Sequence, residues 1–360
     1  MKIRNKLFIL IFLSAFILTL NPASLCAHEE TPAGQHYTLV DEHNNIIHQT
    51  SIKVHVGDEY ISEDNSRYEV VEIIGHTARC RYKGKEKMPE INWEKDKNKT
   101  AERDILAEKA VPTVSGKNKP TIAVYCTHSD ESYVPTDGTE SKPGNGGIYD
   151  VAEAFVGELR KNGFEVKYSK NNHNPHDINA YSRSRRTAIK LLKENPEIIF
   201  DVHRDAVPPQ QYQANVEGKE VTKVKLVVGR SNPNSKTNLE FAKRIKTVMD
   251  KQKPGLSNGI FIGKGDYNQD LSPRAMLIEV GAHTNDKNDA IEGIKEFANI
   301  MPTLLRVEGQ GAPPAQKPLS QNREENKSAY STIIGIIVVL AAAVGGYYLL
   351  NQGSAGKRNG

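Results

Sequence analysis

The chain has 360 residues, of which 38% are hydrophobic and 26% charged, and its formal net charge is +4. This excess of positive charge is too small to indicate nucleic-acid binding by itself, and we predict no nucleic-acid partner. The composition is typical of a soluble extracytoplasmic body, to which the two ends of the chain add segments of a different kind.

The first 27 residues have the pattern of a secretory signal peptide. Positive charges up to Lys6 precede a largely apolar run over residues 7–20, and the small residue Ala27 ends the segment. We therefore expect cleavage after Ala27 and a mature protein outside the cytoplasm. Cys26 raises the alternative of a lipoprotein, but Leu25 stands before it where that modification needs a small residue.

Residues 28–85 predict a small all-β module. Apolar and polar residues alternate there in short runs, and the breaks between the runs fall at turn-forming residues. The runs cover residues 37–40, 52–56, 68–74 and 78–82. A charged stretch with Pro and Gly breaks follows, so we interpret residues 86–118 as a linker. Cys80 and Cys126 then fall in different predicted domains, and we expect two free thiols.

Residues 119–307 alternate strand and helix patterns. The first helix repeats apolar residues at Val151, Phe155 and Leu159 and stops at Gly163. The order of the elements predicts a three-layer α/β domain with a mostly parallel central sheet. The expected strands cover residues 121–125, 164–168, 198–202, 224–228 and 275–280, and the later helices cover residues 182–194, 237–250 and 289–301.

The C-terminal segment predicts a membrane anchor. Residues 308–331 are polar and rich in Pro, which indicates a flexible linker. Residues 332–350 contain no charge and are long enough to cross a bilayer as a helix. Lys357 and Arg358 follow in a tail over residues 351–360, which the positive-inside rule keeps in the cytoplasm. We therefore predict a single-pass cell-membrane protein whose catalytic domain is extracytoplasmic.

Metal-binding side chains follow two of the expected strands. His128 comes after the strand over residues 121–125, and His203 comes after the strand over residues 198–202. Ligands of parallel α/β sheets bind outside the carboxyl ends of the strands, so these side chains should converge. A catalytic zinc ion takes three protein ligands and keeps one open position. His128 and His203 are two candidates for Zn²⁺, and Glu131 is the preferred third ligand, with Glu140 as the alternative.

Glu279 ends a third apolar strand and has a different predicted role. A carboxylate is costly to bury without a function, and beside zinc it would take a proton from water and pass it to the leaving nitrogen. We predict that four nearby polar residues contact the substrate: Arg204, Asp205, Asn268 and His283. The alternative for Arg204 and Asp205 is that they form salt bridges in their loop. His173 and His176 stand in a polar loop and would contact substrate or be solvated.

Several of these motifs together resemble the stage II sporulation protein P family. The matching blocks are Thr127-His128-x-x-Glu131-Ser-Tyr, Asp201-Val-His-Arg-Asp205 and Tyr267-Asn-Gln-Asp-Leu-Ser-Pro273 running into Leu277-Ile-Glu-Val-Gly281. The resemblance extends over residues 121–304 and leaves out the β module. It implies a zinc N-acetylmuramoyl-L-alanine amidase fold, with His128 and His203 as zinc ligands and Glu279 as the catalytic carboxylate. It also implies thinning of septal peptidoglycan during engulfment, beside the sporulation proteins D and M.

Three functions remain open at this point. The leading hypothesis is a membrane-tethered zinc amidase that acts on peptidoglycan, with endopeptidase activity as a further property of the family. The first alternative is a zinc carboxypeptidase or endopeptidase that cuts within stem peptides. The second is a wall-binding scaffold without catalysis, which the presence of His128, His203 and Glu279 together disfavours.

Overall fold

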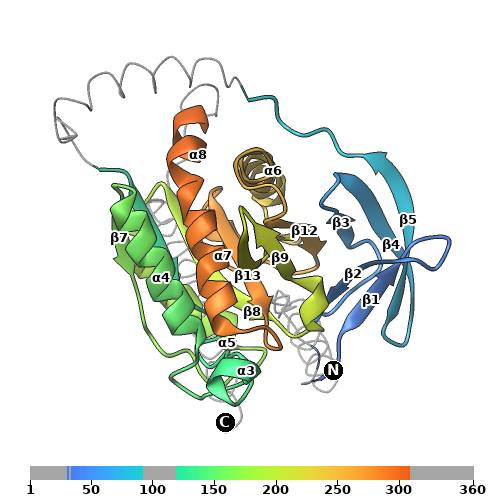
Figure 1. Ribbon diagram of the computed structural model, residues 1–360, viewed down its shortest axis with the longest axis horizontal. Helices are drawn as coiled ribbons and strands as arrows, with labels where there is room; N and C mark the ends of the chain where they lie inside the picture. The colour runs from blue at the N-terminus through green and yellow to red at the C-terminus, as the bar shows by residue number, and fades with distance from the viewer. Residues whose placement is uncertain (1–30, 32–33, 92–118, 309–360) are drawn as a thin grey trace, which may run out of the picture. The chain divides into compact units, whose positions relative to one another are not determined.

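The computed structural model describes residue 31, residues 34–91 and residues 119–308 (Figure 1). All of them belong to one compact unit, Met1–Ala315. The predicted signal peptide, most of the predicted linker and the predicted anchor over residues 332–350 lie outside the described residues. Within the described ranges, no helix combines the length and the apolar character that crossing a bilayer requires.

The described chain folds around one mixed sheet of eleven strands. Their order is β2-β1-β5-β4-β3-β12-β11-β13-β8-β6-β7, so the N-terminal strands continue the sheet of the predicted catalytic domain (Figure 1). The strands are β1 Tyr37–Val40, β2 Ile46–Thr50, β3 Glu59–Ile61, β4 Ser66–Ile74, β5 Thr77–Lys85, β6 Thr121–Tyr125, β7 Glu165–Tyr168, β8 Ile198–Asp205, β11 Val224–Gly229, β12 Ser257–Gly263 and β13 Ala275–Ala282. A separate hairpin pairs β9 Gln213–Val216 with β10 Lys219–Thr222.

Helices cover both faces of the half of this sheet that residues 119–308 form. They are α3 Val134–Asp137, α4 Ile148–Lys161, α5 Ala180–Leu192, α6 Ser235–Gln252, α7 Lys287–Asn299 and α8 Met301–Glu308. The core formed with α4, α6, α7 and α8 contains Ile198, Phe200 and Val202, whereas Ile199 packs with α5 on the opposite face. This alternation along one strand confirms the predicted three layers.

The eleven-stranded sheet as a whole is mixed, but its part over residues 119–308 is mostly parallel, as predicted, because only one of the pairings there, between β11 and β13, is antiparallel. Strands β13, β8, β6 and β7 run parallel to one another, and β11 and β12 form a second parallel pair. The two groups meet antiparallel at β11 and β13, and β3 joins β12 antiparallel. Strand β11 runs antiparallel to β13, a direction that the sequence did not predict. The periodicity of a buried strand does not encode its orientation.

Some elements differ from their predicted positions. The predicted strand over residues 52–56 is not a strand. The strands on either side of it in the chain are β2 and β3, which the sequence did not predict. Strand β12 was missed because Ser257 to Gly259 have the composition of a turn. Gly259 has φ +73°, and a Cβ atom there would lie 2.3 Å from the carbonyl oxygen of Ile61. Glycine at this position therefore permits the close approach of β3 to β12.

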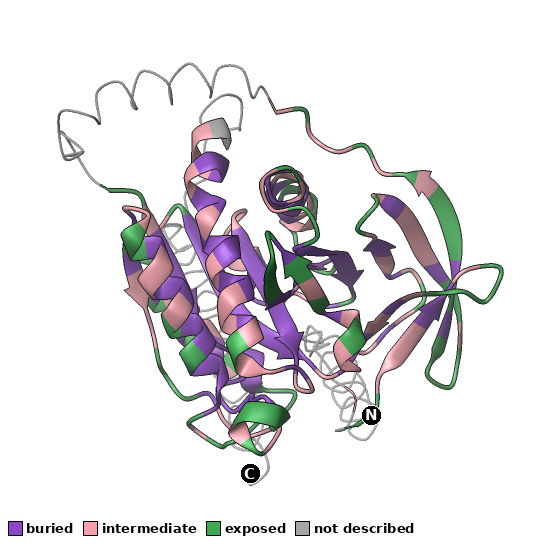
Figure 2. Cartoon of the chain, viewed as in Figure 1, coloured by how far each residue is buried: buried purple, intermediate pink, exposed green. Residues whose placement is uncertain are grey.

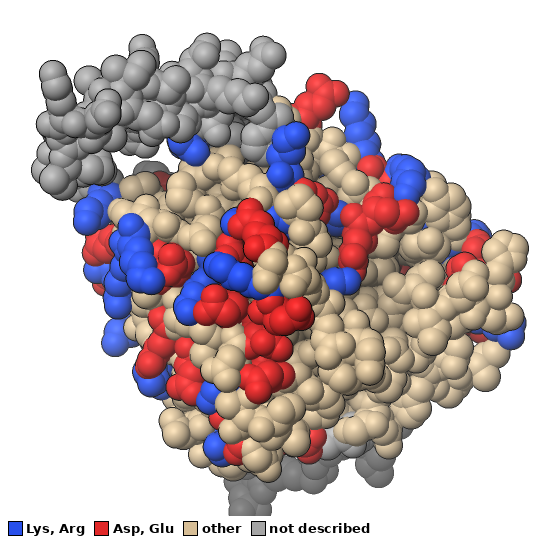
Figure 3. All heavy atoms as spheres, viewed as in Figure 1, with Lys and Arg blue, Asp and Glu red and all other residues tan. Residues whose placement is uncertain are grey.

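Burial follows the sheet. Strands β8, β11, β12 and β13 are buried at every residue, whereas most residues of β4 and β5 are partly or fully exposed (Figure 2). Cys80 and Cys126 are free and buried, as predicted. The face drawn in Figure 3 carries acidic and basic side chains interspersed. Among the charged side chains, Lys287 Nζ of α7 lies 2.6 Å from Asp137 Oδ1 and 2.6 Å from Asp150 Oδ2.

Candidate metal centre and catalytic carboxylate

The candidate site lies where the parallel strands β6, β8 and β13 end. His128 and Glu131 belong to the loop after β6, His203 lies near the end of β8, and Glu279 lies near the end of β13. All four side chains are buried, with at most 3% of each residue exposed. The strand ends therefore bring together the three sequence clusters, as the topology of parallel strands predicts.

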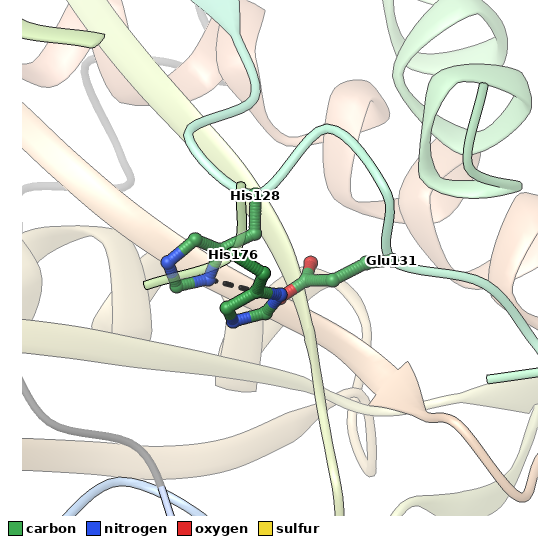
Figure 4. Close-up of side chains that lie close together, drawn as sticks. All are labelled: His128, Glu131 and His176. Atoms are coloured by element: carbon green, nitrogen blue, oxygen red, sulfur yellow. Dashed lines mark hydrogen bonds and ion pairs between the residues drawn. The ribbon is translucent and has the colours of Figure 1, made fainter. Parts of the chain in front are cut away.

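Three imidazoles approach the carboxylate of Glu131. Its Oε1 lies 3.2 Å from His128 Nδ1 and 3.5 Å from His203 Nδ1. His176 joins from the loop between β7 and α5, and its ring stacks on that of His128 with 3.8 Å between centroids. Potential ligand atoms of His128, Glu131 and His176 all lie within 4.8 Å of one another (Figure 4). This is the spacing at which one ion can bind several donors.

His176 is the member of this group that sequence reasoning missed as a ligand. A usable signal existed, because β7 runs parallel to β6 and its following loop must emerge at the same edge of the sheet. Glu140, the alternative third ligand, does not belong to the close group of ligand atoms that contains Glu131. Its backbone carbonyl instead accepts hydrogen bonds from Ser132 N and Arg204 Nη2, both at 2.9 Å.

Two of the histidines have a carboxylate behind them. Asp130 Oδ1 lies 3.2 Å from His176 Nδ1, and Asp201 Oδ1 lies 3.0 Å from His203 Nε2. Such partners orient the ring and leave the other nitrogen for a metal ion. His173 differs, because its two nitrogens lie 2.8 Å from Cys126 O and from Thr187 Oγ1, which makes it a structural residue.

Opposite charges within the group shift the pKa values of its members. Burial alone would raise the pKa of Glu131, but His203, the hydrogen bond with His128 and the charge of Arg204 hold that pKa well below its usual value. Burial alone would lower the pKa of His203, but Asp201 and Glu131 hold it well above its usual value. Each group therefore has partners that favour its charged form.

Glu279 stands next to His203 in a row across the sheet. Glu279 pairs with His203 of β8 on one side and with Lys225 of β11 on the other, so all three side chains share one face. Its Oε2 is buried and has no hydrogen-bond partner among the described residues. Burial raises the pKa of Glu279 to about 8, against the opposing charge of Lys225. A carboxyl group with this pKa can exchange a proton near neutral pH.

Two of the predicted substrate-binding residues are engaged in holding the site. Arg204 N donates to Glu131 Oε2 at 3.0 Å, and its guanidinium Nε donates to Ser132 O at 3.2 Å. Asp205 is fully buried and accepts hydrogen bonds from Ser51 N at 2.8 Å and from Tyr212 OH at 2.9 Å. Both residues therefore fix the end of β8 that follows His203, and Arg204 also ties it to the loop of Glu131.

The other two predicted contacts differ from each other. Asn268 Nδ2 donates to Tyr181 O at 3.2 Å and to Ser184 Oγ at 3.1 Å, which ties its loop to α5. His283 is partly exposed, and its Nδ1 has no hydrogen-bond partner among the described residues. Burial also lowers the pKa of His283, so the neutral ring is favoured and can accept a hydrogen bond.

The donors present suit zinc. Zinc in proteins prefers imidazole nitrogen and carboxylate oxygen, and the close group of His128, Glu131 and His176 supplies both. His203 faces the same Glu131 oxygen from the neighbouring strand. The carboxylates behind His176 and His203 complete the arrangement that metal-binding histidines usually have.

The comparison with known families agrees with these motifs. The model of stage II sporulation protein P matches residues 38–302, which is more than half of the 360-residue chain. The chain belongs to this family. A curated relative, stage II sporulation protein P of Bacillus subtilis (strain 168), is 29% identical over 212 residues. That alignment covers 54% of this chain and 52% of the relative, so the chain spans about half the length of the curated protein it matches.

The family match corrects one inference from the sequence. The resemblance began at residue 121, whereas the family model begins at residue 38 and so includes strands β1 to β5. The N-terminal β module is therefore a part of the family pattern. This agrees with the single sheet, in which β3 pairs with β12.

Solved structures with partial similarity are amidases by their titles. The N-acetylmuramyl-L-alanine amidase Ami1 from Mycobacterium smegmatis is 15% identical, with a TM-score of 0.36, over 54% of this chain and 100% of that one. The CwlD amidase from Clostridioides difficile is also 15% identical, with a TM-score of 0.36, over 53% of this chain and 100% of that one.

Proposed function

We propose that the chain is a zinc-dependent peptidoglycan hydrolase that cleaves the amide bond between the lactyl group of the glycan and the stem peptide. One observation carries the catalytic part of this proposal. The buried Glu279, with an unpartnered oxygen, pairs across the sheet with His203, which faces the Glu131 carboxylate at the centre of the histidine group. The candidate metal ligands and a carboxyl group of raised pKa thus lie at the same edge of the sheet.

The residues of the chain divide the proposed reaction among them. His128, Glu131 and a third ligand would hold zinc, which would supply Lewis-acid chemistry to the scissile carbonyl and to water. Glu279 accepts the proton of the attacking water and then donates it to the leaving nitrogen, which is general base and then general acid catalysis. Arg204 holds the Glu131 carboxylate in place through its backbone N–H.

The substrate class rests on the family. Peptidoglycan, and the sporulation proteins D and M as partners, come to this chain from its resemblance to stage II sporulation protein P. Identification of the products from purified sacculi tests the bond that is cut. An amidase releases a free lactyl group, whereas a new terminus within the stem peptide would assign a carboxypeptidase or endopeptidase.

Metal content gives the first test. We expect the full chain to contain close to one zinc ion and to lose its hydrolysis of sacculi when a chelator removes that ion, because an activated water at neutral pH requires the metal. Metal analysis and product release are measured on the same sample, and zinc is then added back. Undiminished hydrolysis by protein that is free of zinc would reject the mechanism.

Single-ligand variants identify the third ligand. His128→Ala should abolish zinc binding, because His128 belongs to every ligand set that the site offers. We expect His203→Ala to weaken zinc binding more than His176→Ala, since His203 is buried on a strand whereas His176 is exposed in a loop. The reverse order would assign His176 as the third ligand and His203 to a supporting role.

The location is a separate proposal. We propose that residues 332–350 hold the protein at the cell membrane with the catalytic domain outside, because this run is apolar and charge-free and Lys357 and Arg358 follow it. Deleting residues 331–360 should move the protein from the membrane fraction to the soluble fraction while hydrolysis of soluble wall fragments continues. Sedimentation of the truncated protein with membranes would place the anchor elsewhere in the chain.

A further inference from the structure

The row across the sheet continues beyond Glu279 to a buried lysine that the proposed reaction does not use. Lys225 is 0% exposed, and its Nζ forms an ion pair with the equally buried carboxylate of Asp205. The strand order is β11-β13-β8, so Lys225 on β11 and Asp205 on β8 are separated by β13. The Lys225 side chain must cross β13 to reach Asp205. It crosses where Glu279 stands, because Lys225 and Glu279 are register partners.

The N-terminal β module supplies the remaining contacts of this ion pair. Lys225 Nζ donates to Thr50 Oγ1 at 3.0 Å, at the end of β2. Ser51 donates to Asp205 Oδ1 twice, from its backbone N and from its Oγ, both at 2.8 Å. Both module residues are at most 3% exposed. Two residues from the first sixth of the chain thus fix a charge pair beside the candidate catalytic carboxylate.

A purely structural role would not require this arrangement. A buried ion pair contributes little to stability compared with apolar side chains of the same volume, because desolvation offsets the attraction. Its fixed geometry, by contrast, restricts what can lie next to it. Glu279 has an oxygen without a hydrogen-bond partner among the described residues, so the neighbouring Lys225 side chain is a means of limiting where that carboxylate can point.

We propose that Lys225 is a positioning residue for the Glu279 carboxylate, and that the N-terminal β module is part of the catalytic centre because Thr50 and Ser51 hold the Lys225–Asp205 pair. This inference rests on the proposed hydrolase function. It assigns to the module a task within the site, in place of a separate wall-binding or spacer role.

The test compares two substitutions of Thr50 in the full-length, zinc-loaded protein. Thr50→Val keeps the shape of the side chain and removes the oxygen that accepts from Lys225, whereas Thr50→Ser keeps that oxygen and removes a methyl group. We expect kcat on soluble muropeptides to fall about 10-fold in Thr50→Val, in line with misplacement of a catalytic group, with KM and bound zinc unchanged. The Thr50→Ser variant should keep most of the kcat of the wild type.

Thr38→Val is the matched control. Thr38 lies on the neighbouring strand β1, and its Oγ1 accepts a hydrogen bond from Gln49 Nε2 at 3.3 Å without reaching the ion pair. We expect its kcat to equal that of the wild type. A fall in Thr38→Val as large as that in Thr50→Val would mean that the module acts only through general stability, and the proposal would be wrong. Equal losses in Thr50→Val and Thr50→Ser would have the same meaning.

A second variant tests Lys225 itself. Lys225→Met alone would leave Asp205 buried without its partner and endanger folding, so it is combined with Asp205→Asn, whose amide oxygen can accept from Ser51 while its NH2 group can donate to the Tyr212 hydroxyl oxygen. The double variant should fold, bind zinc with unchanged affinity and lose kcat about 10-fold to 100-fold. A folded double variant with normal kcat would overturn the positioning role. If the wild type itself releases no product from sacculi, the proposed function has failed and not merely this inference.

Discussion

Glu279→Gln is expected to lower turnover roughly 100-fold or more while zinc stays bound, because the amide cannot take a proton from water or return it to the leaving nitrogen. The variant keeps the size of the side chain and a carbonyl oxygen, so the fold and the neighbouring His203 and Lys225 retain their positions. Turnover on soluble muropeptides and zinc content are measured together. Zinc loss as complete as in His128→Ala would make Glu279 a ligand, and near-normal turnover would assign the base to another residue such as His283.

The same substitution should stabilise the metal-free fold at alkaline pH. The pKa of Glu279 is raised to about 8 in the folded protein from 4.5, so the folded state binds this proton more tightly than the unfolded state. Because of this difference, the free energy of unfolding of the wild-type protein falls as pH rises from about 5 to 8. Glu279→Gln removes that loss and should be about 1–4 kcal/mol more stable than the wild type above pH 8. Urea unfolding at pH 5 and pH 9, with a chelator present, measures the difference.

Glu296→Gln is the control of opposite sign. Glu296 of α7 lies 2.9 Å from Lys219 Nζ and 2.8 Å from Lys253 Nζ. Burial would raise its pKa, but these two lysines lower the pKa to about 2. Its ionised form therefore stabilises the fold above the unfolded pKa, and Glu296→Gln should destabilise the protein at neutral pH. If Glu279→Gln also destabilises the metal-free protein at pH 9, the pKa of Glu279 is not raised by burial in the folded protein.

With Glu279 in its proposed catalytic role, a gain in stability on its neutralisation would mean that the protein has given up stability for function. Glu279, which is expected to lower stability, was also the residue that the sequence indicated most clearly. It lies between the apolar residues 275–278 and Val280, where a charged side chain has no structural reason to be. The strand β6 and the stop at Gly163, which has φ +91°, were likewise predicted from local patterns. Local chemistry was sufficient for these positions.

Positions that depend on distant parts of the chain were not predicted. His176 appeared as one polar residue in a loop, and only the parallel pairing of β7 with β6 brings it to His128. The pairing of β3 with β12 joins residues about 200 positions apart, and no periodicity within either segment encodes the partner of the other. The buried Lys225 would have been a signal, since a lysine within the apolar run 224–228 needs a carboxylate, but its partner could not be named from sequence.

The shared sheet leads to the second prediction of large effect: a chain that starts at residue 119 should not fold. Removal of the module leaves β12 without β3 and exposes apolar residues that pack against the module, among them Val227, Phe261 and Leu277. Exposing several such side chains costs about 1.5–3 kcal/mol each, which together approaches the whole stability of a typical domain of about 5–15 kcal/mol. Asp205 also loses both donors of Ser51.

The measurement compares residues 119–308 with residues 31–308, which keep every described strand. We expect the longer chain to be soluble, to unfold cooperatively in urea and to bind zinc, and the shorter chain to aggregate or to lack cooperative unfolding. A shorter chain with the same unfolding midpoint and zinc affinity would show that the module is a separable domain attached to a complete catalytic fold. Loss of the fold would instead explain why the family pattern begins at residue 38, because the strands that precede the catalytic segment complete its sheet and hold the charge pair beside Glu279.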